Sequence, residues 1–327
     1  MIDPLLFTLH GVPVVQKGAR GLALGTMNFG KRTPAAESES IIARAIERGV
    51  TFIDTANAYV DGESERIVGR AIRGKRDKVT IATKVGFGRV DGRPEGLSRA
   101  RIHAAIDDSL KRLGMDEVDV YYLHVPDHAV PIEESLSAME ELVRAGKTRA
   151  VGVSNYAAWQ ILDMMQLSEP GRSPAPVVSQ VLYNLLIREI EIEYAAFTRA
   201  HPIHTTVFNP LAGGLLSGKH ARGASAAKGS RFDKNRLYEG RYWSDRFFDL
   251  VDAYGAIARD EGMSLVDLSY AWIAGQPHVD SIILGPASVE HLDAGIDACA
   301  KTVSPEARAR IDGIHRGYLG TESSYVR

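Results

Sequence analysis

The strongest constraint on the fold of this chain is an apolar strand-like run followed by a helix-like run, repeated eight times along the sequence. The strand-like runs are residues 21–24, 51–53, 79–83, 118–123, 149–153, 177–181, 205–208 and 281–284. Helical patterns, with apolar residues three and four positions apart, lie between them, for example at 101–113, 132–145 and 289–298. Eight strand–helix units predict a (β/α)₈ barrel, the TIM-barrel form of an α/β fold.

Two features outside the repeat complete the predicted architecture. Residues 7–9 and 12–15, around His10-Gly11, indicate a β-hairpin ahead of the barrel. The stretch 217–240 is one long polar loop, and long loops in compact domains are usually functional. The competing fold is an open doubly wound sheet, but no G-x-G-x-x-G follows an early strand. Because no linker divides the chain, we expect residues 1–327 to form a single barrel domain with long loops at the carboxyl ends of its strands.

Length and composition narrow the class of protein. With a net charge of −2, the 327-residue chain lacks the excess of Lys and Arg that a nucleic-acid or membrane surface needs. Cys299 is the only cysteine, which excludes an intrachain disulfide and favours a reducing compartment. No signal-peptide pattern is present, and no run approaches 18 apolar residues. We therefore expect a cytoplasmic protein without a nucleic-acid or membrane partner.

Polar side chains stand at the predicted ends of several strands. Asp54, Lys84 and His124 end the second, third and fourth strands, and Tyr59 follows Asp54 by five residues. Taken singly, each has an ordinary structural explanation as a helix cap, a packed ring or a satisfied core residue. Active sites of (β/α)₈ barrels lie at the carboxyl ends of the strands, so these four side chains are expected to share one rim.

The chemistry open to such a group is specific. Lys84 next to Tyr59 is expected to lower the pKa of the phenol, and Asp54 to keep Lys84 charged and oriented. A tyrosine in this setting can donate a proton to a carbonyl oxygen, with His124 hydrogen-bonding the same oxygen. A hydride is still required, and because no side chain supplies one, a cofactor must.

These residues also carry a family resemblance. Their settings, DTANAY, TKVG and YYLHVPD, are similar to those of the catalytic tetrad of the aldo-keto reductases. The resemblance covers essentially the whole chain and extends to GLALGTMNFG, VGVSNY, VVSQVLYN and NPLAGGLLSGK. Within the family, VSNYAAW, RYW at 241–243, ILG at 283–285 and the terminal Tyr325-Val326-Arg327 resemble the branch of aflatoxin B1 aldehyde reductases and succinic semialdehyde reductases.

The resemblance implies a set of cofactor contacts. Ser154, Asn155 and Gln180 would bind the nicotinamide carboxamide, and Phe208 would stack on the nicotinamide ring. The loop from Asn209 to Gly218 would wrap the pyrophosphate through backbone amides, Arg231 would contact a phosphate, and Ser288 the adenosine end. The full cofactor set implied is Asp54, Ser154, Asn155, Gln180, Phe208, Asn209, Pro210, Leu211, Gly213, Leu215, Ser217, Gly218, Arg231, Ser288 and His291.

The sequence departs from the family pattern where the adenosine 2′-phosphate is bound. Many relatives have a basic residue, a Gln or Arg and an Asn there, whereas this chain has Ala287, His291 and Gly295. Cationic side chains are the usual phosphate anchors, so their absence weakens the preference for NADPH over NADH. NADPH remains the cofactor implied by the resemblance, with NADH as the alternative.

The resemblance also implies a substrate pocket lined by Tyr59, His124, Tyr238, Arg241 and Arg327. A guanidinium offers paired donors that match a carboxylate, so Arg241 and Arg327 would favour aldehydes such as succinic semialdehyde or 2-carboxybenzaldehyde. The expected reaction is NADPH-dependent reduction of aldehydes, including carboxylate-bearing or dicarbonyl ones, to alcohols. The expected partner is a small aldehyde or ketone; a homodimer is compatible with the sequence, which leaves the oligomeric state open.

Alternative functions are weighed on single motifs. GGLLSGKH at 213–220 falls short of a P-loop because His220 replaces the hydroxyl that would bind Mg²⁺. His124 and Asp127 suggest a metal-dependent hydrolase, but no second strand end completes a metal site, so none is predicted. A Schiff base at Lys84 leaves Asp54 and Tyr59 without a purpose. A cofactor-bound regulatory or redox-sensing protein of the same fold, with little turnover, remains open.

Overall fold

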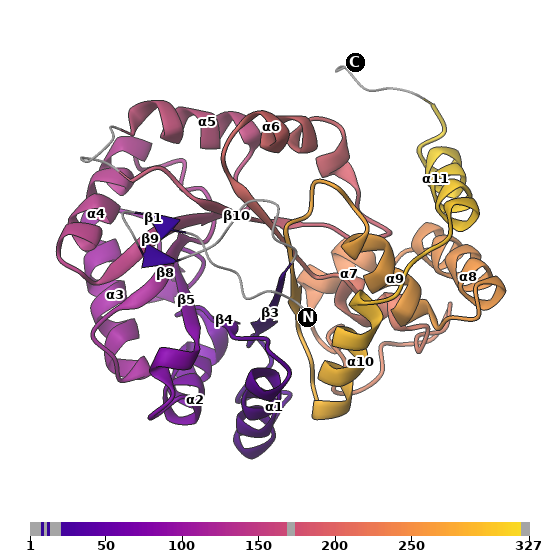
Figure 1. The fold of residues 1–327 in the computed structure, drawn as a ribbon, viewed down its shortest axis with the longest axis horizontal. Helices are drawn as coiled ribbons and strands as arrows, with labels where there is room; N and C mark the ends of the chain where they lie inside the picture. Colours follow the sequence, from indigo (N-terminus) through magenta and orange to yellow (C-terminus); the bar gives the residue numbers. More distant parts are fainter. Residues whose placement is uncertain (1–7, 10–11, 14–20, 169–173, 322–327) are drawn as a thin grey trace.

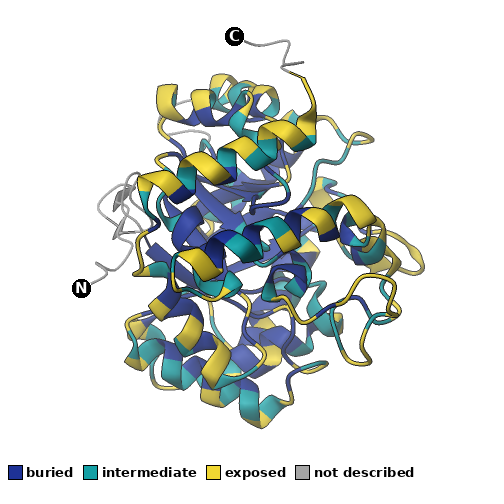
Figure 2. Cartoon of the chain, turned by 90° about the vertical axis from the view of Figure 1, so that its right-hand side faces the viewer, coloured by how far each residue is buried: buried dark blue, intermediate teal, exposed yellow. Residues whose placement is uncertain are grey.

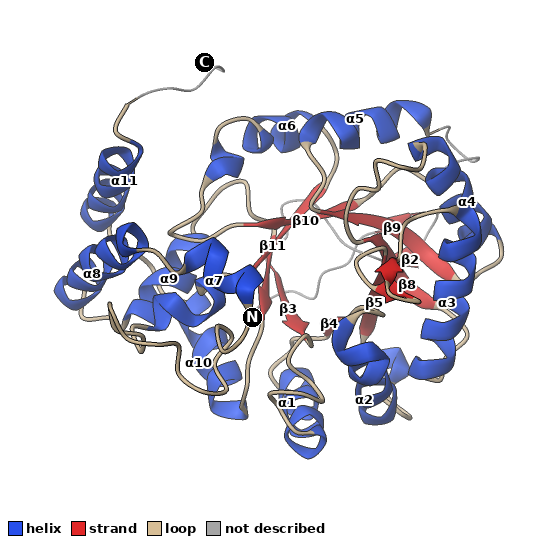
Figure 3. Ribbon diagram, turned by 180° about the vertical axis from the view of Figure 1, so that it is seen from behind, coloured by secondary structure: helices blue, strands red, loops and turns tan. Residues whose placement is uncertain are grey.

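A closed barrel of eight parallel strands forms the centre of the molecule (Figures 1 and 3). The computed structural model describes residues 8–9, 12–13, 21–168 and 174–321. The barrel strands are β3 (Gly21–Gly25), β4 (Phe52–Asp54), β5 (Thr80–Val85), β8 (Val118–Leu123), β9 (Thr148–Ser154), β10 (Val178–Leu182), β11 (His204–Phe208) and β12 (Ser281–Leu284). They pair in chain order, and β12 closes the barrel by pairing with β3. The predicted (β/α)₈ barrel is confirmed.

Helices surround the barrel and cover its strands, as Figure 3 shows. They are α1 (Ala35–Glu47), α2 (Glu63–Ala71), α3 (Arg99–Leu113), α4 (Ile132–Arg144), α5 (Ala158–Leu167), α6 (Tyr194–Ala200), α7 (Arg236–Tyr242), α8 (Asp245–Asp260), α9 (Leu265–Ala274), α10 (Val289–Cys299) and α11 (Pro305–Leu319). Their inner faces are buried and their outer faces exposed, as the colours of Figure 2 show. This is the pattern that apolar residues at helical spacing predict. No helix within the described residues is long and apolar enough to cross a membrane.

The elements around the barrel differ in places from the expectation. Thr8–Leu9 (β1) pairs with Val12–Pro13 (β2), which confirms the core of the hairpin, while the rest of the predicted hairpin lies outside the described residues. A second small hairpin, β6 (Arg89–Val90) with β7 (Arg93–Pro94), was not expected. Its two-residue strands are too short to leave an alternating pattern. The polar stretch 217–240 is also only partly a loop, because α7 begins inside it.

The interior of the barrel is filled by a small apolar cluster on the inner faces of the strands. Its members include Phe52, Val120, Tyr122 and Ile283. Tyr122 occupies its place only because β9 carries a glycine opposite it. A Cβ atom on Gly152 would lie 2.4 Å from Cε1 of Tyr122, which is far inside van der Waals contact. Lys84 Nζ lies 5.6 Å from the centroid of the Tyr122 ring. The packing of Tyr122 against Gly152 therefore supports Lys84, which lies near the carboxyl end of its strand.

Gly152→Ala should therefore destabilise the fold. Overpacking a filled core typically costs about 1–3 kcal/mol, and we expect a loss of this size in the free energy of unfolding measured in urea. Gly313→Ala is the matched control, because no atom lies within 4 Å of its added Cβ and the residue is inside α11. That change should be neutral or stabilising by about 0.5–1 kcal/mol. Equal stability of the Gly152→Ala variant and the wild type would contradict the packing described.

Candidate active site

The four residues predicted at the strand ends share the carboxyl rim of the barrel. Asp54 is the last residue of β4, Lys84 lies near the end of β5, and His124 follows β8 directly. Tyr59 begins the short 3₁₀ helix η1 (Tyr59–Gly62) that leads into α2. Parallel pairing of neighbouring strands brings these ends together. We call these four side chains the tetrad.

A buried ion pair forms the base of the tetrad. Lys84 Nζ donates to Asp54 Oδ1 and, at 2.8 Å, to the carbonyl oxygen of Thr55. The second oxygen of Asp54 accepts a hydrogen bond from the Gln180 side chain, so both oxygens of the carboxylate are satisfied. Burial alone lowers the pKa of Lys84, but the attraction of Asp54 and Tyr59 outweighs it, and the net pKa lies above the ordinary value. Lys84 is therefore charged at neutral pH.

Tyr59 packs between Lys84 and His124. Lys84 Nζ lies 5.2 Å from the Tyr59 ring centroid, and the His124 ring lies edge-on with its centroid 5.9 Å away. Burial raises the pKa of Tyr59, Lys84 lowers it, and Asp54 raises it again, so the net direction is upward. The expected net lowering of this pKa by Lys84 is therefore wrong for the protein alone, because burial outweighs the ammonium. The phenol stays protonated at neutral pH.

His124 is a neutral imidazole in this site. Its side chain is 8% exposed, and Nδ1 has no hydrogen-bond partner among the described residues. Burial, and then the charge of Lys84, hold the pKa of His124 well below its usual range. A neutral imidazole keeps one nitrogen as a donor and one as an acceptor, which suits it to orient a polar ligand atom.

The backbone just after Tyr59 is strained. Val60 has φ 50° and ψ 47°, and Asp61 follows with φ 52° and ψ 41°. This left-handed conformation is uncommon for any residue other than glycine and is costly for a β-branched one. Such strain of about 1–3 kcal/mol persists only where the surrounding contacts hold it, and it is concentrated at functional sites.

The residues expected around the nicotinamide follow the next three strands. Asn155 takes a left-handed φ of 63°, and its side chain donates to the His124 carbonyl oxygen at 2.9 Å and to Ser154 Oγ at 3.1 Å. Gln180 lies in β10 with its side chain on Asp54, and Phe208 ends β11 against the apolar cluster inside the barrel. These side chains therefore lie on the same rim as the tetrad.

A glycine turn follows β11. Residues 212–217 form a short 3₁₀ helix in which Gly213 and Gly214 have φ values of 69° and 103°. Asn209 Oδ1 accepts a hydrogen bond from the Gly213 N–H at 2.8 Å, which fixes the start of the turn. An added Cβ on Gly214 would lie 3.8 Å from Lys219 Nζ, so a cation faces the bare side of the turn. The predicted pyrophosphate loop ends at Gly218, and the structure adds Lys219 as a residue beside it.

Two guanidinium groups meet beyond this turn. Arg231 and Arg32 both donate to Oδ1 of Asn28, at 2.9 Å and 3.0 Å. Arg231 also donates to the Tyr238 hydroxyl at 3.1 Å. Burial and the charge of Arg231 lower the pKa of Arg32. Neither guanidinium has a hydrogen bond or ion pair to a carboxylate within the described residues. Arg32 and Asn28 were missed, although the charge of Arg32 was visible in the sequence.

The same cluster adjoins the segment expected to bind the adenosine. The Asn28 side chain donates to the Gly285 carbonyl oxygen at 3.4 Å, which ties the loop after β3 to the loop before α10. Ser288 caps α10 and accepts from the His291 N–H at 3.3 Å. His291 is exposed at that helix start. Ser288 and Arg231 are therefore brought into one neighbourhood.

The expected substrate contacts are less complete. Tyr238 is buried beneath Arg231, and Gly213 packs against its ring, since an added Cβ would lie 2.8 Å from Cδ1. Arg241 lies in α7 beside Tyr242, whose pKa is raised by burial although a hydrogen bond with Asn184 and the charge of Arg241 act to lower it. Arg327 lies outside the described residues.

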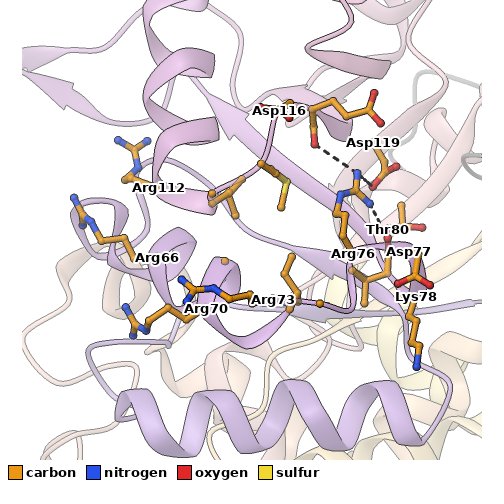
Figure 4. A pocket seen from close by; sticks show the side chains of 18 of the residues that line it. Arg66, Arg70, Arg73, Arg76, Asp77, Lys78, Thr80, Arg112, Asp116 and Asp119 are labelled. Atoms are coloured by element: carbon orange, nitrogen blue, oxygen red, sulfur yellow. Dashed lines mark hydrogen bonds and ion pairs between the residues drawn. The ribbon is translucent and has the colours of Figure 1, made fainter.

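A wide pocket of about 1510 Å³ lies at the opposite end of the barrel (Figure 4). Thr80, Asp119 and Arg149 in its wall stand at or near the first residues of β5, β8 and β9. Asp119 pairs with Arg76 at 2.9 Å and with Arg149 at 3.3 Å, so these charges satisfy one another. The tetrad lies at the other end of the barrel, away from this pocket.

Comparison with known proteins gives the family and the fold of the chain. The model of the aldo/keto reductase family matches residues 21–316. Human aldo-keto reductase family 7 member A3 is 34% identical over 316 residues, covering 90% of this chain and 92% of that protein. A probable voltage-gated potassium channel subunit beta from Arabidopsis thaliana is 33% identical and covers 86% and 89%. The solved structure of a glycerol dehydrogenase from Gluconobacter oxydans superposes with a TM-score of 0.77 at 26% identity, covering 98% of this chain and 97% of that chain.

A closed parallel barrel with an aspartate, a tyrosine, a lysine and a histidine on its carboxyl rim defines a class of NAD(P)H-dependent oxidoreductases that act on carbonyl compounds. The chain belongs to the aldo/keto reductase family. Human aflatoxin B1 aldehyde reductase member 2 is 33% identical over 316 residues, covering 90% of this chain and 85% of that protein. The resemblance stated from the sequence motifs is thereby confirmed.

The environment of His124 gives a prediction about pH. We expect His124 to stay neutral until well below its usual pKa of about 6.5, as measured by NMR titration of ¹⁵N-labelled imidazole. Below about pH 6.5 the unfolded chain binds a proton that the folded chain refuses, so the free energy of unfolding should fall as the pH drops toward the folded pKa. Lys84→Met should raise the pKa of His124, because it removes a repelling charge. Titration of wild-type His124 near its ordinary value would contradict the site described.

Proposed function

We propose that this protein reduces aldehydes to alcohols with NADPH, and that Tyr59 is the proton donor. The observation that supports this most directly is the buried Lys84–Asp54 ion pair under a protonated Tyr59, beside a neutral His124. A carbonyl oxygen gains negative charge as its carbon is reduced, and it needs a donor that is still protonated at neutral pH. A phenol whose pKa is raised by burial meets that need.

Each member of the tetrad has a separate task in this proposal. Tyr59 gives its proton to the oxygen, and the ammonium of Lys84 stabilises the phenolate that remains. Asp54 keeps Lys84 charged inside the barrel and fixes its direction. His124 donates a hydrogen bond to the carbonyl oxygen and so orients the aldehyde. These tasks require only positions on one rim, where the four side chains lie.

The residues past β11 fit a dinucleotide cofactor, which supplies the hydride when bound. The positive φ values of Gly213 and Gly214 open the turn so that backbone N–H groups can approach a pyrophosphate, and Lys219 lies beside it. We propose Ser154, Asn155 and Gln180 for the nicotinamide carboxamide and Phe208 for its ring. Ser288 and His291 at the start of α10 are proposed for the adenosine.

The pair Arg32 and Arg231 supports NADPH over NADH. Two guanidiniums that share one neutral oxygen, and that pair with no carboxylate in the part of the chain that the structure describes, form an arrangement that an anion would stabilise. The pair is tied through Asn28 to the loop before α10, where the sequence lacks the usual 2′-phosphate anchors. We propose that it takes over the role of those anchors.

We also propose that the substrates include aldehydes that carry a carboxylate or a second carbonyl. Aldehydes with a carboxylate or a second carbonyl fit Arg241, Arg327 and Tyr238 on chemical grounds, since a guanidinium binds a carboxylate through paired donors. Relatives named for aflatoxin B1 aldehyde reduction support an aldehyde substrate in general. We also propose that residues 1–327 form one domain, because the barrel draws its strands from residues 21–284.

A cofactor-bound regulatory protein is the second candidate, favoured by relatives named as potassium channel subunits. A regulatory protein would bind NADPH and turn over aldehydes slowly, whereas an enzyme would turn over rapidly through Tyr59. Steady-state oxidation of NADPH and NADH with a panel of charged and uncharged aldehydes distinguishes the two.

Tyr59→Phe tests the proton donor. General acid catalysis is worth about 10²–10⁴-fold, and we expect kcat for aldehyde reduction to fall by at least that lower limit. NADPH binding, followed by quenching of protein fluorescence, should be nearly unchanged, because the phenol is not assigned a cofactor contact. A variant that keeps more than about a tenth of the wild-type rate would show that another group supplies the proton.

Arg32→Ala and Arg231→Ala test the cofactor. A charge-assisted hydrogen bond is worth about 1.5–3 kcal/mol, so each change should raise the Kd of NADPH by about 10- to 100-fold. The Kd of NADH should change much less, because NADH lacks the 2′-phosphate. Equal weakening of both cofactors would place the pair at the pyrophosphate, and tighter binding of NADH by the wild type would refute the NADPH proposal.

A further inference from the structure

Glu95 is a buried carboxylate that receives hydrogen bonds from four donors. Its side chain is 2% exposed, although it follows the small β6–β7 hairpin at the surface of the barrel rim. Oε1 accepts from Asn57 Nδ2 at 2.6 Å and from Arg101 Nε at 3.0 Å. Oε2 accepts from the Gly86 N–H at 2.8 Å and the Gly88 N–H at 3.2 Å. Both oxygens are therefore fully used.

The four donors come from three separate parts of the chain. Asn57 lies two residues before Tyr59 in the loop after β4, and the Tyr59 N–H closes the turn by donating to the Ala56 carbonyl oxygen at 3.1 Å. Gly86 and Gly88 lie in the loop after β5, directly beyond Lys84. Arg101 lies in α3. One carboxylate thus ties the loop that carries Tyr59 to the loop that follows Lys84.

The loop that follows His124 is held by a residue just after Glu95. The Leu97 N–H donates to Asp127 Oδ2 at 2.8 Å, and Asp127 lies three residues after His124. The Leu97 side chain also covers Gly86, because a Cβ added to Gly86 would lie 2.5 Å from Leu97 Cδ2. The segment 95–97 therefore contacts the loop that leads to Tyr59 and the loops that follow Lys84 and His124.

The hydrogen bonds to Glu95 fix the orientation of Phe87. It stands between the two glycines whose N–H groups bind Glu95, and Gly86 takes a φ of 109°. Two N–H groups that converge on one oxygen make an anion-binding concavity, so the carboxylate fixes the direction of the turn. The Phe87 ring centroid lies 5.1 Å from that of His124, and 51% of the Phe87 side chain is exposed. An exposed aromatic ring beside His124 offers an apolar surface to the substrate.

We propose that Glu95 is a positioning residue of this enzyme: it holds the Tyr59 and Phe87 side chains in fixed positions beside His124. This inference rests on the proposed role of Tyr59 as the proton donor. It assigns Phe87 as the platform for the apolar body of the substrate, so aromatic aldehydes gain more from it than small aliphatic ones. The strained turn at Val60 gives the reason why a carboxylate is needed here: that backbone persists only when contacts outside it hold it.

Glu95→Gln is the decisive change. A glutamine has nearly the same shape, but its NH₂ group cannot accept, so it leaves either Asn57 and Arg101 or the two glycine N–H groups without an acceptor. A displacement of about 1 Å can cost about 10²-fold in rate. We expect kcat/KM for benzaldehyde to fall by about 10- to 100-fold, with the Kd of NADPH changed less than about twofold. The melting temperature should also fall, because buried donors lose their acceptor, so the rate is expressed per molecule that still binds NADPH.

Three further variants separate positioning from loss of structure. Asn57→Ala breaks only the tie to the Tyr59 loop and should lower kcat for benzaldehyde and propanal alike, with little change in KM. Phe87→Ala should raise KM for benzaldehyde and leave propanal nearly unchanged. Glu95→Gln should show both effects, a lower kcat for the two aldehydes and a higher KM for benzaldehyde. Glu141→Gln is the matched control: that carboxylate also has several partners, Arg99 and His103, but lies on the outer helix α4, and its loss should leave kinetics unchanged.

The outcomes that would overturn the proposal are distinct from failure of the proposed function. Wild-type kinetics in Glu95→Gln would refute it. The proposal would also be refuted if the rate of Glu95→Gln fell only in proportion to the fraction of protein that still binds NADPH. That result would indicate a purely structural role for Glu95. If Glu95→Gln does not fold, equal kinetics of Asn57→Ala and wild type would refute it instead. Tyr59→Phe, assayed beside them, reports on the proton donor alone: an active Tyr59→Phe enzyme rejects the proposed function whatever Glu95 does.

Discussion

The ion pair between Lys84 and Asp54 is the interaction on which the site depends. A buried ammonium is expensive unless a carboxylate and hydrogen-bond acceptors surround it, and here Asp54 and the Thr55 carbonyl oxygen supply them. Gln180 satisfies the remaining carboxylate oxygen from the other side of the barrel. Three strands, β4, β5 and β10, must close into one ring before these groups meet. The charge at the rim is therefore a consequence of barrel closure.

The placement of that charge decides the protonation of its neighbours. Lys84 repels a proton from His124 and so helps burial to keep the imidazole neutral. At Tyr59 the same ammonium acts against burial, and burial outweighs it, so the phenol keeps its proton. Lys84 thus helps to keep His124 neutral, whereas Tyr59 stays protonated in spite of the same charge because burial is the larger effect. The pKa directions fit a reductive role better than an oxidative one, because a reductase needs its general acid, here Tyr59, to be protonated before the reaction.

Sequence reasoning located the barrel and the tetrad because both depend on periodic patterns. Apolar strands of period two and helices of period 3.6 fix the order of elements, and the carboxyl rule for barrels places Asp54, Lys84 and His124 together. Contacts between loops that lie far apart in the sequence could not be predicted in this way. Arg32 and Arg231 lie 199 positions apart in the sequence and meet only through Asn28, and the donors to Glu95 come together only when two loops and the start of α3 fold back. The sign of the Tyr59 pKa shift was missed for a related reason: burial depends on all surrounding elements, while the charge of Lys84 can be seen in one motif.

The division between strands and loops explains how such a site keeps its geometry. Residues within strands, Asp54, Lys84 and Gln180, are held by the sheet and need only one another. Tyr59 and Phe87 lie beyond the strand ends, where backbone hydrogen bonds of the barrel no longer reach, and Val60 is already strained. Loops in that position keep one conformation only if a group with several acceptor sites ties them together, and a carboxylate has more of these than any neutral side chain. The two guanidiniums on Asn28 present the reverse case, since among the described residues neither has a hydrogen bond or ion pair to a carboxylate. The donors around Glu95 thus find their acceptor within the protein, whereas we propose that the two guanidiniums find theirs in a bound phosphate.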